Sequence, residues 1–232
     1  MTTTRTATAN TPGDGRYRLP TDPSRPSGGT LARAHDTRLG REGLLRWNDD
    51  AARAEDVAAR LSGFDHPGVA RVLDAGADPG THGSFSVFAF LDWPTLADAP
   101  PSGRPADIAA AAAWLVAAYA TAQARCGEAL GVRAHDVLVD PRAVTGDLPA
   151  GECAVRWMPG PARGGDDLAT VVAGLGDRAG RRARRRFGIA VDLLALPHGR
   201  RRAVTVLAGI AGLDPLLLGL SPAASHQVAA VA

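Results

Sequence analysis

Short apolar runs separated by glycine, proline and aspartate fill the first part of the chain beyond residue 15. Five runs have the length and flanking residues of β-strands: residues 17–19, 31–34, 43–47, 69–73 and 85–91. Residues 49–61 differ, because Ala, Val and Leu recur there at helical spacing behind an acidic first turn. The pattern predicts a strand-rich region that contains one helix.

The second part of the chain has a helical pattern. A proline-rich stretch leads into a long, Ala-rich, apolar segment at 106–125, which predicts a helix. Beyond it the pattern stays mostly helical, with short strands predicted at 137–139 and 154–157. We therefore predict an α+β fold with four parts: a disordered leader at 1–15, a strand-rich N-terminal lobe at 16–93, a linker at 94–105 and a helical C-terminal lobe at 106–232.

The composition is that of a globular protein. With 232 residues and 45% apolar side chains, the chain can bury a substantial core. Cys126 and Cys153 are too few for a disulfide framework, and the leader lacks the charged and apolar regions of a signal peptide. The apolar stretch at 108–122 is too short to cross a bilayer, and that at 203–220 contains an aspartate and a proline. We expect a cytoplasmic protein without a transmembrane segment.

The chain contains no lysine, because all 26 of its basic residues are arginine. A guanidinium cannot replace the compact, deprotonatable ammonium of lysine in a Walker-type phosphate loop, a Schiff-base enzyme or an ordinary protein kinase. The usual forms of these three proteins are therefore excluded. The six histidines are scattered and share no metal-ligand spacing with the two cysteines, so we predict no metal site.

The arginines are concentrated in one segment. Residues 178–202 hold nine Arg against one acid, a local charge of +8 in a chain whose net charge is +2. Nucleic-acid phosphates, an anionic membrane face or a phosphorylated partner could each bind such a segment, and a solvated helical face is the plain alternative. Phe187 is the one aromatic residue of this segment, so base stacking has little support and we expect no nucleic-acid partner. The candidate anion-binding residues are Arg181, Arg182, Arg184, Arg185 and Arg186.

Five segments share their pattern and their order with a known family: RYRL at 16–19, GGTLARAHDTRLGRE at 28–42, LSGFDHPGVARVLDAG at 61–76, SVFAFLDWPTLAD at 86–98 and AHDVLVDP at 134–141. They resemble bacterial serine/threonine protein kinases of the actinobacterial type. The resemblance implies a two-lobed kinase-like fold over about residues 16–160. Beyond Gly160 it fades, with DDLATVVAGLG at 166–176 resembling a core helix of the large lobe, so a truncated or rebuilt C-terminal lobe is expected.

The resemblance places degenerate residues at the nucleotide cleft. Gly28 and Gly29 would cover the phosphates, but neighbouring prolines disfavour a tight cradle of backbone N–H groups. Arg46 stands at the position of the phosphate-binding lysine, and Glu55 is the candidate for the helix glutamate with which it would pair. An ion pair that braces the lobe without a ligand is the alternative for these two residues. The other cleft positions are Phe90, Asp92, Asp136, Arg156 and Trp157.

At the positions that the resemblance assigns to them, the groups that perform phosphoryl transfer are missing. Counting back five residues from Asp136, at a magnesium-ligand position, puts Gly131 where the proton-accepting aspartate belongs. The second magnesium-binding aspartate has no counterpart, because Arg156, Trp157 and Met158 stand in that region. Asp136 could bind a cation or cap a turn. We predict no catalytic residue and expect neither ATP nor magnesium as a cofactor.

These features favour a catalytically inactive, protein-kinase-like domain, a pseudokinase, that acts as a regulatory or protein-binding module in bacterial signalling. Similar inactive domains accompany the lipid II flippase of peptidoglycan synthesis, so the resemblance implies a link to cell-wall synthesis and a partner that reads phosphothreonine. One alternative is an active, atypical phosphotransferase that uses arginine for lysine and Asp136 or Asp140 for magnesium. A second alternative is an Arg-driven nucleic-acid-binding protein.

Overall fold

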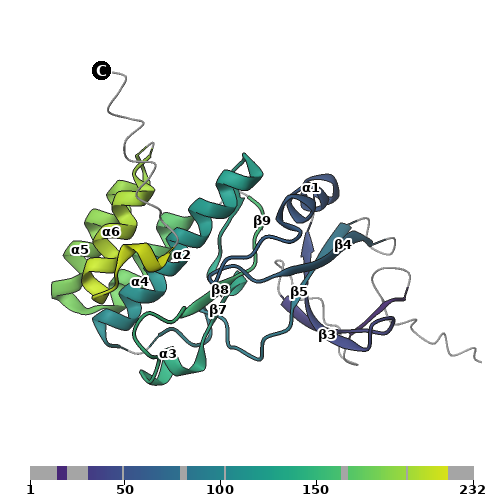
Figure 1. Cartoon of the computed structure of the whole chain (residues 1–232), viewed down its shortest axis with the longest axis horizontal. Helices are drawn as coiled ribbons and strands as arrows, with labels where there is room; N and C mark the ends of the chain where they lie inside the picture. Colours follow the sequence, from purple (N-terminus) through teal and green to yellow (C-terminus); the bar gives the residue numbers. More distant parts are fainter. Residues whose placement is uncertain are drawn as a thin grey trace, which may run out of the picture. The chain divides into compact units, whose positions relative to one another are not determined.

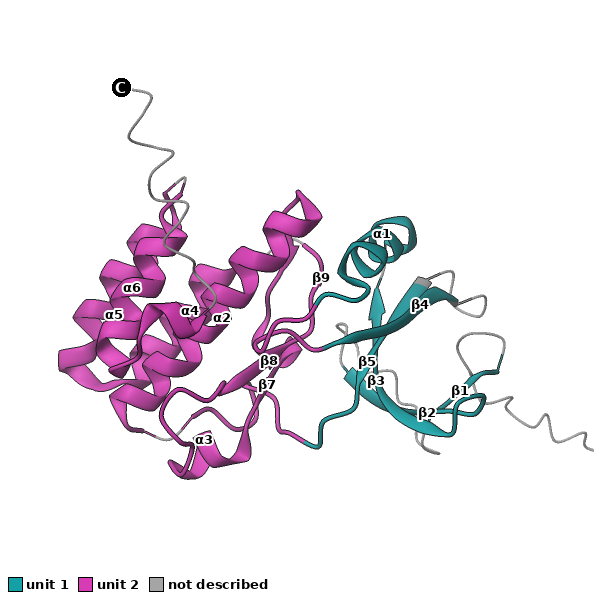
Figure 2. Cartoon of the chain, in the orientation of Figure 1, with its two compact units in different colours: residues 1–64, 71–92 teal, residues 65–70, 93–232 magenta. Residues whose placement is uncertain are grey.

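The chain forms two compact units in the computed structural model (Figures 1 and 2). The structure describes residues 15–19, 31–48, 50–78, 83–101, 103–162, 167–196 and 198–218. Unit 1 consists of Met1–Phe64 and Arg71–Asp92, and unit 2 of Asp65–Ala70 and Trp93–Ala232. The predicted leader lies outside the described residues except for Gly15.

Unit 1 is a five-stranded antiparallel sheet with one helix. Its strands are β1 (Tyr17–Arg18), β2 (Leu31–Asp36), β3 (Arg41–Asn48), β4 (Val72–Asp78) and β5 (Gly83–Ala89), in the order β1-β2-β3-β5-β4. The helix, α1 (Ala51–Leu61), packs against β4 and β5. The strand-rich region with one helix that the apolar runs predict is therefore confirmed.

The fourth strand differs from its prediction. The apolar run at 69–73 predicts a strand there, whereas β4 begins only at Val72. Val69 instead forms an isolated bridge with Trp157 in unit 2, where the Ala70 N–H donates to the Trp157 carbonyl at 2.8 Å. Val69 and Ala70, which begin this run, are buried beside Trp157 and do not belong to the sheet of unit 1.

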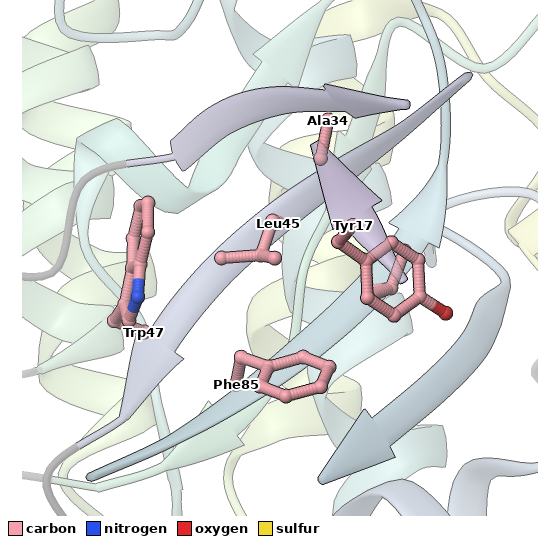
Figure 3. Packing of buried hydrophobic residues seen from close by; sticks show 6 residues of the cluster. Tyr17, Ala34, Leu45, Trp47 and Phe85 are labelled. Carbon is pink, nitrogen blue, oxygen red and sulfur yellow. The ribbon is translucent and has the colours of Figure 1, made fainter. Parts of the chain in front are cut away.

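Side chains of β3 alternate between two buried sides of the sheet. On one side lies the core cluster of unit 1, which consists of Tyr17, Ala34, Leu45, Trp47, Phe85 and Val87 (Figure 3). Within it, the Tyr17 and Phe85 rings meet edge to face with centroids 5.5 Å apart. Because successive strand residues point to opposite sides, Arg46 lies on the side away from this cluster.

A charged network lies at the start of β1. Arg16 Nε and Nη2 donate to the two carboxylate oxygens of Asp36 at 3.0 and 2.7 Å, and Nη1 donates to Asp74 Oδ2 at 2.5 Å. The Arg16 guanidinium, together with the N–H groups of Leu39 and Arg38, lowers the pKa of Asp36 to about 2 against the opposing effect of burial. Asp36 is therefore held in its charged form.

We predict that Asp36→Asn lowers the stability of unit 1 by about 1–2 kcal/mol at neutral pH. The folded-state pKa lies below the ordinary value of 3.8, so the stabilisation is fully present above that pH and is lost as the pH falls toward about 2. Urea unfolding across this pH window should show a flatter dependence for the variant. Asp56→Asn, at a surface pair with Arg60, is the control and should cost less than about 0.5 kcal/mol. Identical pH profiles for wild type and Asp36→Asn would contradict this role.

Unit 2 is mainly helical. Its longer helices are α2 (Pro105–Cys126), α4 (Leu168–Arg178), α5 (Gly180–Leu194) and α6 (Arg200–Ala211). Its short elements are β6 (Leu130–Gly131), η1 (Ala134–Asp136), β7 (Val137–Val139), α3 (Pro141–Thr145), β8 (Val155–Trp157), β9 (Gly160–Pro161) and η2 (Pro215–Leu218). The predicted helix at 106–125 and the strands at 137–139 and 154–157 are confirmed to within one residue at each end.

The central helix of unit 2 is α2, which packs against α6 and α4. It begins at Pro105, whose fixed φ suits a first turn, and ends where Gly127 adopts a φ of 74°. Its side chains are buried on all sides between Ile108 and Ala118. Length and composition alone would let α2 cross a membrane, but 67% of its apolar window is buried inside the fold, as in the core helix of a globular domain.

The contact between α4 and α5 depends on a glycine. A Cβ at Gly176 would lie 2.7 Å from the Cβ of buried Phe187, closer than non-bonded carbons approach. We predict that Gly176→Ala destabilises unit 2 by about 1–3 kcal/mol. A Cβ at Gly174 meets no neighbouring atom within 4 Å, so Gly174→Ala should be neutral or stabilising by up to about 1 kcal/mol. Urea unfolding checks the pair of variants, and equal stabilities would contradict the packing.

Candidate functional site

Arg46 lies in β3 on the side of the sheet away from the core cluster. It is completely buried and stands across from Ser86 in β5. Two residues further along β3, the Asn48 amide donates to the Ser86 hydroxyl at 3.1 Å. At the other end, Leu44 and Phe88 stand across from each other and are both buried. Arg46 therefore has polar neighbours on one flank and bulky apolar neighbours on the other.

Glu55 lies elsewhere in unit 1. It is exposed on α1 and lines a groove of about 350 Å³ together with β4 residues such as Asp74. Among the residues that the structure describes, no ion pair joins Glu55 to Arg46. The reason is geometric: α1 is buried along Ala54, Val57, Ala58 and Leu61, and a residue one position away from that stripe is rotated by about 100°.

Phe90 and Asp92 follow β5, which ends at Ala89 rather than at residue 91 as predicted. The Arg33 guanidinium of β2 lies over the Phe90 ring, 4.7 Å from its centroid. Asp92 is exposed at the end of unit 1. The two predicted phosphate-loop residues, Gly28 and Gly29, lie outside the described residues.

In unit 2, β6 and β9 form a short antiparallel pair in which Gly131 stands across from Gly160. The family resemblance assigns Gly131 to the position of the proton-accepting aspartate. Neither glycine has a side chain, so this cross-strand pair contains no group that could take a proton from a substrate hydroxyl.

Asp136 ends the η1 turn, and Arg133 binds both of its carboxylate oxygens. Arg133 Nε donates to Oδ2 at 2.9 Å, and Nη2 donates to Oδ1 at 3.3 Å. The Asp136 side chain is 0% exposed and that of Arg133 is 21% exposed. The Asp136 carbonyl also accepts from the Met158 N–H at 2.9 Å. Sequence reasoning missed Arg133; the signal was its spacing of three residues from Asp136, which a 3₁₀ turn brings to one side.

Trp157 is a core residue of unit 2. It is fully buried, pairs with Val137 between β8 and β7, and packs against the Tyr119 ring of α2 with centroids 5.5 Å apart. Its neighbour Arg156 places its guanidinium 5.6 Å from the centroid of the Trp93 ring. Met158, immediately after β8, is also fully buried. The region in which the resemblance implies a second magnesium-binding carboxylate thus contains two buried apolar side chains and one arginine.

Asp140 serves as the N-cap of α3. Its Oδ1 accepts from the Arg142 N–H at 2.8 Å, and its Oδ2 accepts from Arg142 Nη2 at 2.8 Å. Burial raises the pKa of Asp140, but the Arg142 side chain and N–H outweigh it and hold the pKa below its ordinary value. This short helix was not predicted as a separate element, although the Asp-Pro pair that starts it is a known initiation signal.

Three other kinds of group were candidates for chemistry or binding: a thiol, metal-ligating side chains and the arginines of α5. Burial raises the pKa of the Cys153 thiol to about 11, which disfavours the nucleophilic thiolate. Within the part of the chain that the structure describes, no three His, Cys, Asp or Glu side chains gather into a potential metal site. The candidate anion-binding arginines of α5 are all exposed: Arg181, Arg182, Arg184, Arg185 and Arg186.

A pocket of about 300 Å³ in unit 2 was not predicted. Val132, Arg133 and Ala134 line one side, and α4 lines the other, including Val171 and Arg178. Its walls are mainly apolar, with two guanidinium groups among the lining residues. The sequence shows no sign of it, because it exists only once α4 lies next to the segment before η1.

No family profile and no curated protein matches this chain. Solved structures do match it. The kinase domain of Mycobacterium tuberculosis PknI, solved as a single-residue mutant, is similar with a TM-score of 0.58 and 15% sequence identity, over 89% of this chain and 99% of that chain. This chain has a protein-kinase-like fold. A crystal structure of Rad53 1-466 in complex with AMP-PNP is similar with a TM-score of 0.47 and 13% identity over 84% of this chain, which spans 48% of that chain.

The kinase-like fold confirms the predicted fold class: a five-stranded antiparallel sheet with one helix precedes a mainly helical part. Phosphoryl transfer on such a fold needs a phosphate-binding cation, a positioned base and magnesium ligands. In the described part of this kinase-like chain, Gly131, which the resemblance assigns to the base position, is paired with Gly160, and the buried Asp136 is bound by Arg133.

Proposed function

We propose that this kinase-like chain is a catalytically inactive regulatory or protein-binding module of bacterial signalling. The observation that carries the proposal is the pairing of Gly131, which the resemblance assigns to the place of the catalytic base, with a second glycine, Gly160. A proton acceptor within hydrogen-bond reach of the substrate hydroxyl is needed for transfer to a protein. A glycine offers only its backbone, whose amide groups are not bases near neutral pH.

Magnesium binding is disfavoured by the partners of the remaining acids. Mg²⁺ prefers oxygen ligands in near-octahedral geometry, and its kinase sites use carboxylates together with nucleotide phosphates. At Asp136 the ion would compete with the two hydrogen bonds from Arg133, whose positive charge would repel it. Asp140 would have to leave both the α3 cap and Arg142.

A module of this kind acts by binding. We propose a protein partner in the cytoplasm, and the resemblance to the inactive domains that accompany the lipid II flippase supports a role in cell-wall synthesis. A partner that reads phosphothreonine fits the same resemblance. Neither ATP nor magnesium is part of this proposal.

Thermal unfolding with nucleotide tests the proposal. A ligand at 100 times its Kd stabilises a protein by about 2.7 kcal/mol, which raises the Tm of a domain of this size by roughly 5–10 °C. We expect a change below about 1 °C with ATP and Mg²⁺ together. Mg²⁺-dependent stabilisation by ATP, absent with ATP and EDTA, would contradict the proposal. A catalytically active protein kinase measured under the same conditions is the positive control.

A further inference from the structure

The helix α5 has one buried side and one exposed side. Ala183, Phe187 and Ala190 are buried, at the four- and three-residue spacing of a single helix side. This side packs toward α4 and α6, and α5 is an outer helix of unit 2 (Figure 1). All five arginines of the helix are exposed, so they belong to the part of α5 that unit 2 does not cover.

The exposed side is itself divided. At 3.6 residues per turn, one flank runs from three arginines into three aliphatic residues at the end of the helix and just beyond it. We call this flank the α5 stripe; it consists of Arg182, Arg185, Arg186, Ile189, Leu193 and Leu196. Two of its aliphatic side chains are unusually open to solvent, Ile189 at 49% and Leu196 at 54%. One acidic residue, Asp192, lies at the edge of the stripe.

Two acids, Asp177 and Asp192, lie near the arginines of α5. Arg184 Nε pairs with Asp177 Oδ1 at 3.3 Å, whereas the exposed Asp192 lies at the edge of the stripe, seven residues from Arg185 and four from Leu196. Among the residues that the structure describes, no ion pair involves the three arginines of the stripe. With Asp192 counted at its edge, the stripe keeps a net positive charge, from three arginines against one aspartate, next to exposed aliphatic surface.

We propose that the α5 stripe binds the surface of an anionic lipid bilayer. Guanidinium groups bind lipid phosphates by paired hydrogen bonds, and each cation near such a surface strengthens binding about fivefold. The exposed aliphatic side chains at the other end of the stripe can enter the boundary between headgroups and acyl chains. This peripheral attachment goes beyond the regulatory role proposed above.

A bilayer fits the stripe better than a nucleic acid. Both ligands would attract the arginines, but a nucleic acid gives no reason for two exposed aliphatic residues in line with them. Binding of single strands also relies on aromatic side chains that stack on bases, and the one aromatic residue of α5, Phe187, is 1% exposed. The aliphatic half of the stripe is thus the observation that separates the two ligands.

Sedimentation of the full chain with vesicles tests the proposal. We expect binding to phosphatidylcholine vesicles that contain phosphatidylglycerol, little binding to phosphatidylcholine alone, and weakening with added salt. The triple variant Arg182→Gln, Arg185→Gln, Arg186→Gln should bind roughly 100-fold more weakly. Ile189→Ser with Leu196→Ser should lose roughly tenfold and keep the salt dependence.

A control of equal charge separates a specific surface from bulk charge. Arg38→Gln, Arg41→Gln and Arg71→Gln remove three exposed arginines from unit 1 and should change vesicle binding less than threefold, roughly. Absence of binding to anionic vesicles would overturn the proposal, as would equal losses in the stripe and control variants. Tighter binding to duplex DNA than to vesicles, lost in the stripe variant, would overturn it in favour of a nucleic-acid ligand. All of these outcomes are independent of phosphate transfer.

Discussion

Trp157→Ala will lower the free energy of unfolding of unit 2 by about 3–5 kcal/mol. The indole is fully buried and contacts the Tyr119 ring of α2. The Trp157 backbone also joins β8 to Val69 and Ala70, so a cavity here would loosen two segments that are far apart in sequence. Urea unfolding followed by far-ultraviolet circular dichroism measures the loss.

Trp93→Ala is the matched control for this change. Trp93 is half-buried, and its ring lies beside the Arg156 guanidinium rather than in the core. Its removal should cost about 1 kcal/mol. A cost for Trp157→Ala no greater than that of the control would mean that the indole fills no core position, and the interpretation of this region as packed apolar bulk would be wrong.

Arg133→Met will destabilise unit 2 by about 3 kcal/mol. The change keeps much of the side-chain volume but leaves the Asp136 carboxylate, which is 0% exposed, without the guanidinium that binds both of its oxygens. The double variant Arg133→Met, Asp136→Asn should recover part of this loss, because a neutral amide is less costly to bury than a carboxylate.

A double-mutant cycle of these two positions in urea measures the coupling directly. We expect a coupling free energy above about 1 kcal/mol between Arg133 and Asp136. Arg142→Met, which removes a half-exposed partner of Asp140, is the control and should cost less than Arg133→Met. Independent, additive effects at Arg133 and Asp136 would contradict the view that the carboxylate is committed to the arginine.

The sequence predicted the elements of the fold because their patterns are local. The continuous apolar run in β3 and the apolar helical segments of α1 and α2 each extend over most residues of their element, so the pattern predicts the element from its own residues. The run at 69–73 was predicted to be a strand throughout. Its first residue, Val69, is instead buried by a tertiary contact with Trp157 and lies outside β4. The cap-and-proline start of α3 was present, but the helix is only five residues long.

The candidate site was less predictable than the fold. The absence of a base at Gly131 was predicted from the spacing of the family resemblance, and the structure adds that Gly131 stands across from another glycine, Gly160. The roles of Arg133, Trp157 and the α5 stripe depend on which neighbours cover each side chain, and burial is a tertiary property. The arginine cluster was visible in the sequence, whereas the ion pair of Arg184 with Asp177 and the exposed aliphatic residues in line with the other arginines appeared only with the helix in place.

Transfer of labelled phosphate tests the absence of catalysis most directly. The full chain is incubated with γ-labelled ATP and Mg²⁺, alone and with a general protein substrate, beside an active kinase as positive control. We predict no incorporation above that of a heat-denatured sample. On this account Gly131 supplies no proton acceptor, and Arg133 binds both carboxylate oxygens of Asp136. Incorporation that depends on Mg²⁺ and disappears in Asp136→Asn would contradict this account.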